Sequence, residues 1–314
     1  MYQSRSVKDN IISHSDNMGF EAEYESLKKR ILKEGDMPDC TASKMFEYLE
    51  QLSKFNLGKF IIANKGLSGR WTQYVVLHPQ NGRLTGVNDE GKQFSEMERW
   101  VLDRAPVVLA TQERFFNFQK LLQASLKNKI TLASVPCGAM DDLLGLNFSG
   151  LSAFSLVGID LDADSIDYAK QNAKQNNLAG NCTFIREDAW EMAQENQFDV
   201  IVSNGLNIYE SDSNRLKELY QRFYNCLKSG GKLITSFLTP PLGSEKQSPW
   251  DVQQINKEDL QKQKFIFSYI LNVKWDDCYR SEEEKIKQLE SVGFKNVRVI
   301  YDRQKIFPTV ICEK

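Results

Sequence analysis

Residues 154–176 read FSLVGIDLDADSIDYAKQNAKQN, and this stretch decides the fold. It begins with a short apolar run that is typical of a buried strand and that ends at Asp160. A helix follows, with apolar residues at helical spacing, and either Asp164 or Ser165 is its predicted N-cap. A strand that ends in an acid and leads directly into a helix is typical of a parallel sheet flanked by helices.

The same alternation of strand and helix continues on both sides of this stretch. The predicted strands are residues 130–135, 154–159, 182–185, 198–202 and 232–238. A helix with an apolar face between Leu216 and Leu227 precedes the last of them, and we expect Gly230-Gly231 to end that helix. The pattern predicts an α/β fold.

The C-terminal segment adds a different signal. A predicted helix over residues 283–292 is closed by Gly293, and two β-rich stretches, 297–301 and 308–312, follow. They are close enough in sequence to pair antiparallel. We therefore expect a mostly parallel sheet with an antiparallel C-terminal hairpin.

The chain before Ile130 is mainly helical by its apolar spacing, as in Met45, Leu49 and Leu52. The predicted organisation is a helical N-terminal or lid domain over residues 1–127 and a second domain over 128–314. A helical insertion at about 242–280 interrupts the second domain, and we expect the first 20 residues to form a mobile arm or a lid element.

The composition is that of an ordinary globular protein, with 41% apolar and 26% charged residues. Its 40 basic and 42 acidic side chains nearly balance, which argues against a dedicated nucleic-acid-binding protein. No apolar stretch is long enough to span a membrane, and the polar start lacks the apolar core of a signal peptide. Six scattered cysteines and only two histidines favour reduced thiols in the cytoplasm and predict no metal site.

Ligands of such sheets bind beyond the carboxyl ends of the strands. Gly138, after the first strand, lets the backbone approach a ligand closely. Asp160, which follows Gly138 by 22 residues, is placed to accept hydrogen bonds from both hydroxyls of a ribose. Asp188, after the third strand, is placed to accept a hydrogen bond from an adenine amino group, with Ala189 and Trp190 beside it to pack on the base.

In this order the segments resemble a class I S-adenosylmethionine-dependent methyltransferase, from about Lys129 to Lys314. The segments that carry the resemblance are ASVPCGAM, VGIDLDADSIDYAKQN, FIREDAWE, FDVIVSNGL, LKSGGKLITSF and LESVGFKNVRVIYD. The resemblance implies a Rossmann-like sheet, S-adenosylmethionine as the cofactor and S-adenosylhomocysteine as the product.

It also implies roles for individual residues. Asp160, with Leu161 after it, holds the ribose in such enzymes, and Asp188 with Ala189 lies by the adenine. Ser203 and Asn204, at the end of the fourth strand, then line the pocket near the reactive methyl group.

One loop departs from the family pattern, which has an acid near the end of the first strand and then several glycines. Here Ser134 takes the place of the acid, Pro136 that of the first glycine and Met140 that of the third, so that only Gly138 remains. Cys137 beside it is interpreted as a small tolerated residue and not as a nucleophile, because no histidine or second cysteine accompanies it. The contacts to the methionine end of the cofactor are thus the least defined.

Simpler interpretations compete at several of these positions. Asp160 could be a solvated strand-end carboxylate, Asp188 a helix N-cap, and Asn204 a turn former. The favoured interpretation of Arg114 and Tyr74 is helix packing, and the alternative is that one of them caps the pocket and meets the cofactor carboxylate. Residues 282–285 are interpreted as a solvated first helical turn.

The expected function is transfer of the methyl group of S-adenosylmethionine to a small-molecule acceptor. Alternatives are a protein or RNA methyltransferase, and a binding protein for S-adenosylmethionine without catalysis. No catalytic base is identified, and Tyr209, Glu210 and Asn204 are the nearest candidates. Neither a membrane nor a nucleic acid is an expected partner.

Overall fold

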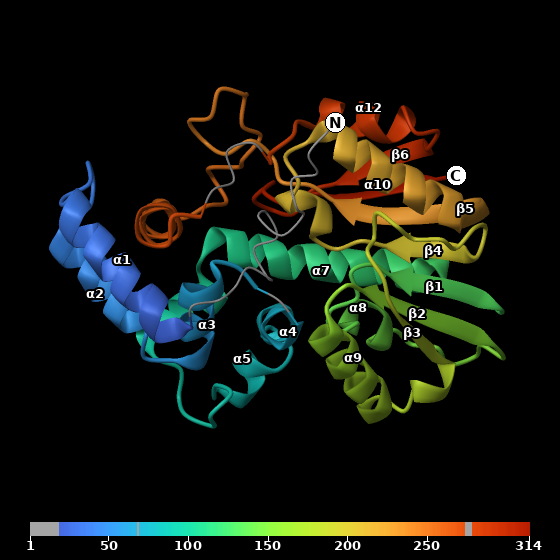
Figure 1. Ribbon diagram of the computed structural model, residues 1–314, viewed down its shortest axis with the longest axis horizontal. Coiled ribbons are helices and arrows are strands. Elements are labelled where there is room, and N and C mark those ends of the chain that lie inside the picture. The colour runs from blue at the N-terminus through green and yellow to red at the C-terminus, as the bar shows by residue number, and fades with distance from the viewer. Residues whose placement is uncertain (1–18, 68, 274–277) are drawn as a thin grey trace, which may run out of the picture. The chain divides into compact units, whose positions relative to one another are not determined.

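The computed structural model describes residues 19–67, 69–273 and 278–314. Two compact units make up the chain (Figure 1). Of the described residues, the helical unit comprises 19–67, 69–109 and 252–273, and the sheet unit comprises 110–251 and 278–314. The predicted arm lies almost wholly outside the described residues.

The helical unit is built from short amphipathic helices. They are α1 (Phe20–Glu34), α2 (Ala42–Leu52), α3 (Asn56–Asn64), α4 (Gly69–Leu77), α5 (Gly82–Thr85), α6 (Glu96–Asp103), α11 (Lys257–Gln263) and the π-helix η4 (Lys264–Ile270). Met45, Leu49 and Leu52 of α2 are buried, as their spacing predicts. Helix α7 (Pro106–Ser125) begins in this unit and continues into the sheet unit.

The insertion between the fifth strand and the last helix belongs largely to the helical unit. The Arg30 guanidinium of α1 donates to the carbonyl oxygens of Tyr269 and Ile270, and the Val107 amide donates to Oε1 of Gln263 at 2.8 Å. Such contacts between distant segments explain why residues 252–276 group with the N-terminal helices. The compact units therefore differ in extent from the two stretches expected at residues 1–127 and 128–314.

A seven-stranded sheet forms the centre of the other unit, with strand order β3-β2-β1-β4-β5-β7-β6. The strands are β1 (Ile130–Ser134), β2 (Phe154–Asp160), β3 (Cys182–Arg186), β4 (Phe198–Val202), β5 (Leu227–Ser236), β6 (Lys295–Ile300) and β7 (Thr309–Glu313). The first five are parallel, and β7 is antiparallel to both β5 and β6. The predicted fold class is confirmed.

Helices cover both faces of this sheet (Figure 1). On one face lie α10 (Ser213–Cys226) and α12 (Glu282–Glu290), and on the other lie α7, α8 (Asp141–Leu144) and α9 (Ala163–Gln175). The remaining elements are the short helices η2 (Ala179–Asn181) and η3 (Leu206–Tyr209). Phe118 and Leu122 of α7 belong to the same core cluster as Ile234 of β5 and Ile311 of β7, so these strand residues point to the face that α7 covers.

Two local predictions about helix ends differ from the structure. The N-cap of α9 is Asp162, whose carboxylate accepts from the Ser165 amide at 3.0 Å, because the chain is still extended at this residue. Gly230-Gly231 lies inside β5 and not at a helix end, since β5 already starts at Leu227 and the pairing with β4 shifts register there. Gly230 has φ 71°, a conformation that glycine adopts without strain.

The first turn of α12 is only partly solvated. Ser281 caps it in a capping box with Glu284, as expected for a solvated acidic turn. Lys285, however, is fully buried and donates to the Tyr220 hydroxyl, and burial lowers its pKa well below the ordinary value. The prediction for this residue was wrong, because its side chain points onto the sheet side of α12, which no local signal marks.

Candidate functional site at the carboxyl ends of the strands

The loop after β1 approaches the end of β2 through backbone hydrogen bonds. The Cys137 amide donates to the Ile159 carbonyl at 2.8 Å, and the Gly138 amide donates to Oδ2 of Asp160 at 2.9 Å. Gly138 has φ 48°, and a Cβ added to it would meet no atom within 4 Å. The glycine is thus required by backbone conformation, and open space lies beside it.

The cysteine in this loop is not suited to covalent chemistry. Cys137 is buried, and burial raises the pKa of its thiol far above the ordinary value, with the carboxylates of Asp160 and Asp142 adding to the shift. A thiol that stays protonated is a poor nucleophile. Pro136 precedes it in a cis peptide with Val135.

Asp160 is a buried carboxylate and not a solvated strand end. It is 7% exposed, and its Oδ1 accepts from the Asp162 amide at 3.0 Å while its Oδ2 accepts from Gly138. Each carboxylate oxygen can accept more than one hydrogen bond. Leu161 next to it is exposed, and its carbonyl accepts from Arg186.

The loop after β3 lies beside the end of β2, because the Glu187 amide donates to the Asp160 carbonyl at 3.0 Å. Asp188 Oδ1 accepts from the Trp190 amide at 2.9 Å, which stabilises the turn itself. Ala189 is buried in the core face that includes α10. Asp188 therefore stabilises the turn, and the N-cap interpretation was wrong, because no helix follows this residue.

The loop after β4 contains buried polar atoms without partners. The Ser203 amide donates to the Ile234 carbonyl at 2.8 Å, but the Ser203 hydroxyl and Oδ1 of Asn204 have no hydrogen-bond partner among the described residues. Gly205 follows with φ 101°. Since buried polar atoms in proteins are nearly always paired, two orphans in one loop mark a place where a ligand would complete the bonding.

The acid missing from the end of β1 has a counterpart that sequence reasoning did not find. The Ser134 hydroxyl donates to Oδ2 of Asp142 at 2.8 Å, and both residues are buried. Burial raises the pKa of Asp142 to about 7, with a smaller contribution from the nearby Asp141 carboxylate. Asp142 thus brings a carboxyl group to the end of β1 from the start of α8.

Of the candidate bases, Glu210 is already engaged. Its carboxylate accepts from the Asp212 amide at 2.8 Å and from Arg215 Nε at 3.0 Å. Desolvation raises the pKa of Tyr209, although the Arg114 cation opposes the shift. The structure does not bring these side chains together as a proton-accepting pair, and a catalytic base is still unassigned.

Tyr74 and Arg114, the two candidates for a contact with the cofactor carboxylate, belong to different units. The Tyr74 hydroxyl donates to Glu98 at 3.3 Å within the helical unit, where it supports helix packing. Arg114 is on α7 in the sheet unit, 7% exposed, with its guanidinium over the Phe307 ring at 4.8 Å. Its Nε and Nη1 have no hydrogen-bond partner among the described residues.

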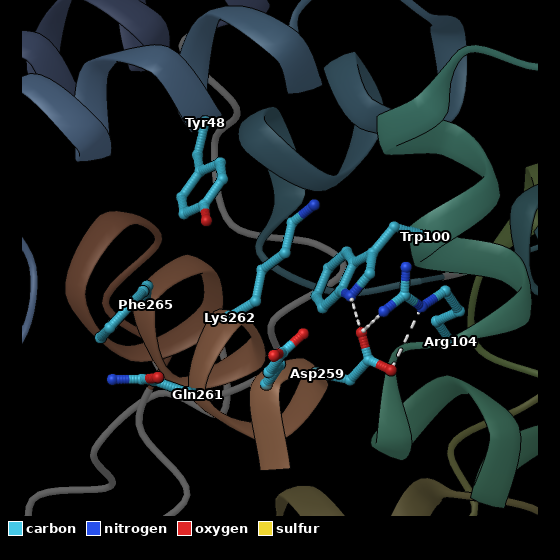
Figure 2. A pocket seen from close by; sticks show the side chains of 8 residues that line it. Tyr48, Trp100, Arg104, Asp259, Gln261, Lys262 and Phe265 are labelled. Atoms are coloured by element: carbon cyan, nitrogen blue, oxygen red, sulfur yellow. Dashed lines mark hydrogen bonds and ion pairs between the residues drawn. The ribbon is translucent and has the colours of Figure 1, made fainter. Parts of the chain in front are cut away.

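A pocket of about 240 Å³ lies within the helical unit (Figure 2). Asp259 is its centre, and its carboxylate accepts from Trp100 Nε1 at 2.8 Å and forms an ion pair with Arg104 at 2.9 Å. Lys262 lies over the Trp100 ring at 4.6 Å and the Tyr48 ring at 5.1 Å. The charged groups that line the pocket contact other side chains of the same unit. These contacts join α11 to α6 and α2 and need no ligand.

In the part of the chain that the structure covers, no three His, Cys, Asp or Glu side chains gather as a metal site. None of the six cysteines, all of which are described, forms a disulfide. No helix among the described residues is long and apolar enough to cross a bilayer.

Comparison with known proteins decides the family. A family model described as a methyltransferase domain matches residues 128–296, more than half of the chain. The chain belongs to this methyltransferase family. The predicted family, the enzyme class and the cofactor, S-adenosylmethionine, are thereby confirmed at the level of the family.

Individual relatives cover different shares of this methyltransferase. The crystal structure of a protein described as a possible exported protein from Bordetella parapertussis has 39% sequence identity and a TM-score of 0.87, over 94% of this chain and 95% of that one. The ribosomal protein L11 methyltransferase of Neisseria meningitidis serogroup C is 32% identical over 119 residues, 38% of this chain and 36% of the relative. The demethylmenaquinone methyltransferase of Bacteroides fragilis is 31% identical over 88 residues, 27% of this chain and 34% of the relative. The chain thus spans about a third of the length of these curated relatives.

The residues at the strand ends fit S-adenosylmethionine. Three neighbouring strands of the sheet, β2, β1 and β4, bring the groups together at their ends. The groups are the open space beside Gly138, the buried carboxylate of Asp160 and the unpartnered polar atoms of Ser203 and Asn204. A nucleoside with a charged amino-acid tail needs this combination of close backbone approach and hydrogen-bond acceptors.

Proposed function

We propose that this chain transfers a methyl group from S-adenosylmethionine to a small-molecule acceptor. Asp160 would accept hydrogen bonds from the ribose, Gly138 and its neighbours Ser134, Pro136 and Cys137 would form the loop along the cofactor, and Asp188 with Ala189 would lie by the adenine. Ser203 and Asn204 would line the methyl end. When bound, S-adenosylmethionine supplies an electrophilic methyl group on a sulfonium.

The observation that carries the small-molecule acceptor is the burial of the unpartnered polar atoms. Ser203 is fully buried, and Ser236 and Thr309, whose hydroxyls also have no partner in the described part of the chain, are fully buried as well. Enclosed polar groups fit a ligand that is surrounded on all sides. The near balance of 40 basic and 42 acidic residues gives no general attraction to nucleic acid.

The chain's own residues contribute mainly by positioning. The side chains after β4 would orient the acceptor, because in-line placement of the two reacting atoms provides much of the rate in such transfers. The apolar surroundings would exclude water, which would otherwise compete as an acceptor. A cytoplasmic location agrees with six free thiols.

The test separates binding from turnover. Calorimetry with S-adenosylmethionine and S-adenosylhomocysteine on the full chain measures binding, and a screen of small-molecule pools with labelled cofactor measures transfer. We expect binding and at least one labelled small product. Binding without any labelled product would favour the non-catalytic alternative, and absence of binding would overturn the proposal.

A protein acceptor is the second candidate, and the similarity to ribosomal protein L11 methyltransferases favours it. The same screen therefore includes ribosomal proteins and total RNA. Label in a protein or RNA band, with none in small molecules, would assign the acceptor to a macromolecule.

A further inference from the structure

Helix α7 packs one face on the sheet, and the charged side chain of Arg114 lies on this face. Phe118 and Leu122 pack into the core, and Arg114 lies one turn before Phe118, so it projects from the same side of the helix. The helix runs toward the start of β1, which brings its earlier turns to the carboxyl ends of the strands. A Cβ placed on Gly205, in the loop after β4, would lie 4.0 Å from Arg114 Nη2.

Arg114 has no carboxylate partner among the described residues. Its Nε and Nη1 are buried without a hydrogen bond, and no ion pair is formed. The nearby carboxylate of Asp302 accepts from the backbone amides of Gln304, Ile306 and Phe307 at 3.1, 3.2 and 2.7 Å, so it is already occupied. Desolvation lowers the pKa of Arg114 to about 10, which still leaves it cationic at neutral pH.

Further unpartnered groups lie on the same side of the sheet. Ser236 and Thr309 are register partners on β5 and β7, two residues from Ile234 and Ile311, which belong to the same core cluster as Phe118 and Leu122 of α7. Side chains two apart on a strand share a face, so both hydroxyls face the α7 side. Ser236 Oγ and Thr309 Oγ1 have no partner in the described residues, and hydroxyls can donate to an anion just as a guanidinium does.

We propose that Arg114, with the hydroxyls of Ser236 and Thr309, binds an oxyanion, a carboxylate or a phosphate, carried by the methyl acceptor. This inference rests on the proposed function. The site belongs to the acceptor and not to the cofactor because its groups come from β5, β7 and α7. The groups proposed for the cofactor's ribose and adenine lie on β1, β2 and β3, on the other side of the point where strand order reverses.

A buried cation that has no hydrogen-bonded carboxylate is costly, so the retention of Arg114 favours a charged ligand. A carboxylate or phosphate matches the planar guanidinium with charge-assisted hydrogen bonds. The ring of Phe307 stacked on Arg114 would contact an aromatic or apolar body attached to the anion. Benzoate and 4-hydroxybenzoate are therefore suitable probes, and benzamide is their neutral counterpart.

The experiment measures thermal stability and calorimetric binding of the full chain with S-adenosylhomocysteine present. Benzoate, 4-hydroxybenzoate, inorganic phosphate and benzamide are titrated into the wild type, Arg114→Met and Arg114→Lys. We expect at least one anion to bind and benzamide not to bind. Arg114→Met should weaken the anion about tenfold or more, and Arg114→Lys should retain part of the affinity.

Arg280→Met is the matched control. Arg280 is also 7% exposed, but its Nη1 and Nη2 donate to the backbone carbonyls of Cys278, Glu210 and Ser211. We expect Arg280→Met to lower the melting temperature and leave anion binding unchanged. Arg114→Met should keep or raise the melting temperature of the free protein, because it removes an unpaired buried charge.

The arms distinguish the possible results. Binding of phosphate but not of the benzoates assigns the anion to a phosphate ester. Equal binding of benzoate and benzamide, or anion binding unaffected by Arg114→Met, overturns the inference, as does the absence of any anion response. Loss of affinity for S-adenosylhomocysteine but not for 5′-methylthioadenosine, which lacks the amino-acid tail, would assign Arg114 to the cofactor carboxylate and also overturn it. An Arg114-dependent anion response without turnover would leave the site intact and count only against the proposed function.

Discussion

Arg104 and Asp259 in the helical unit, and Arg114 in the sheet unit, show two uses of charge in one chain. Asp259 is buried, yet it accepts from Trp100 and pairs with Arg104 at 2.9 Å, so that its charge is neutralised locally (Figure 2). Arg114 is equally buried, but two of its three nitrogens have no partner in the described residues. Around the first group polar atoms are satisfied, and around the second several are not.

Whether buried polar atoms have partners distinguishes a structural contact from a binding site more clearly than the presence of a pocket does. The pocket at Asp259 looks like a binding site in outline, but its central charges already bond to one another. The carboxyl ends of β4 and β5 provide polar atoms that the described fold leaves unsatisfied. Because an unsatisfied buried polar group costs about 1–3 kcal/mol, a set of them is expected only where a ligand offsets the cost.

The largest effect expected concerns Asp142, whose buried carboxyl has a neutral partner, Ser134. Its pKa is raised from 3.8 to about 7 in the folded protein, so the folded state binds the proton more tightly. The stability that this gives is present below the unfolded pKa and is lost as the pH rises toward 7. Relative to Asp142→Asn, the wild type should lose about 3 kcal/mol of unfolding free energy between pH 5 and pH 8.

Urea unfolding of both proteins at several pH values measures this. A parallel pH dependence of the two proteins would show that Asp142 is ionised in the folded state throughout. The neutral partner of Asp142 and the cationic partner of Asp259 would then make no difference to how the two acids titrate.

The next largest effect is at Asp259. Asp259→Ala leaves the Trp100 indole N–H without its acceptor and Arg104 without its ion pair, so we expect a loss of about 2–3 kcal/mol in unfolding free energy. Affinity for S-adenosylhomocysteine should not change, because the pair serves packing. Glu258→Ala, at an exposed neighbouring position, is the control and should change stability by less than about 0.5 kcal/mol. Weaker cofactor binding with little loss of stability would reverse the roles given to the two regions.

Asp160→Ala should weaken binding of S-adenosylmethionine at least about tenfold, because a charge-assisted hydrogen bond is worth roughly 1.5–3 kcal/mol. Calorimetry measures the affinity, and circular dichroism verifies that the variant is folded, since Asp160 also accepts from Gly138 and Asp162. Asp167→Ala, with an exposed carboxylate on α9, is the control. Unchanged affinity in a folded Asp160→Ala protein would contradict the ribose role.

The smallest effect is expected at Lys262, whose ammonium lies over Trp100 and Tyr48. Lys262→Met keeps the aliphatic contacts and removes the cation–π attraction, so we expect a loss of no more than about 1 kcal/mol in unfolding free energy. Lys257→Met, at an exposed position at the start of α11, serves for comparison. A loss well above this value would mean that the Lys262 cation contributes to stability as much as the Asp259–Arg104 pair does.

Much of the fold could be predicted because it depends on local sequence patterns. Short apolar runs predicted β1 to β4 closely, and the two β-rich stretches at the end predicted the antiparallel pair. The errors were local as well. The cap of α9 moved to Asp162 and Gly230-Gly231 fell inside β5, since hydrogen bonding of neighbouring residues decides such boundaries.

The site was predictable only where a strand end marks it. Asp160 is a buried acid at the end of β2, and it bonds to Gly138, the two residues that the motif spacing had paired. Asp142 and Arg114 carry no such mark. Asp142 reaches Ser134 from a short helix, and Arg114 reaches the loop at Gly205 from a helix far earlier in the chain.

The sequence by itself determined the order of strands and helices, the family and the acids at the strand ends, because periodicity and strand-end chemistry are properties of neighbours along the chain. Only the tertiary structure decided which buried charges have partners. Arg104 meets Asp259 across 155 residues, and Arg114 meets no acid in the described chain. Pairing depends on distances between segments remote in sequence, and the same residue type becomes a structural contact in one place and a candidate ligand site in the other.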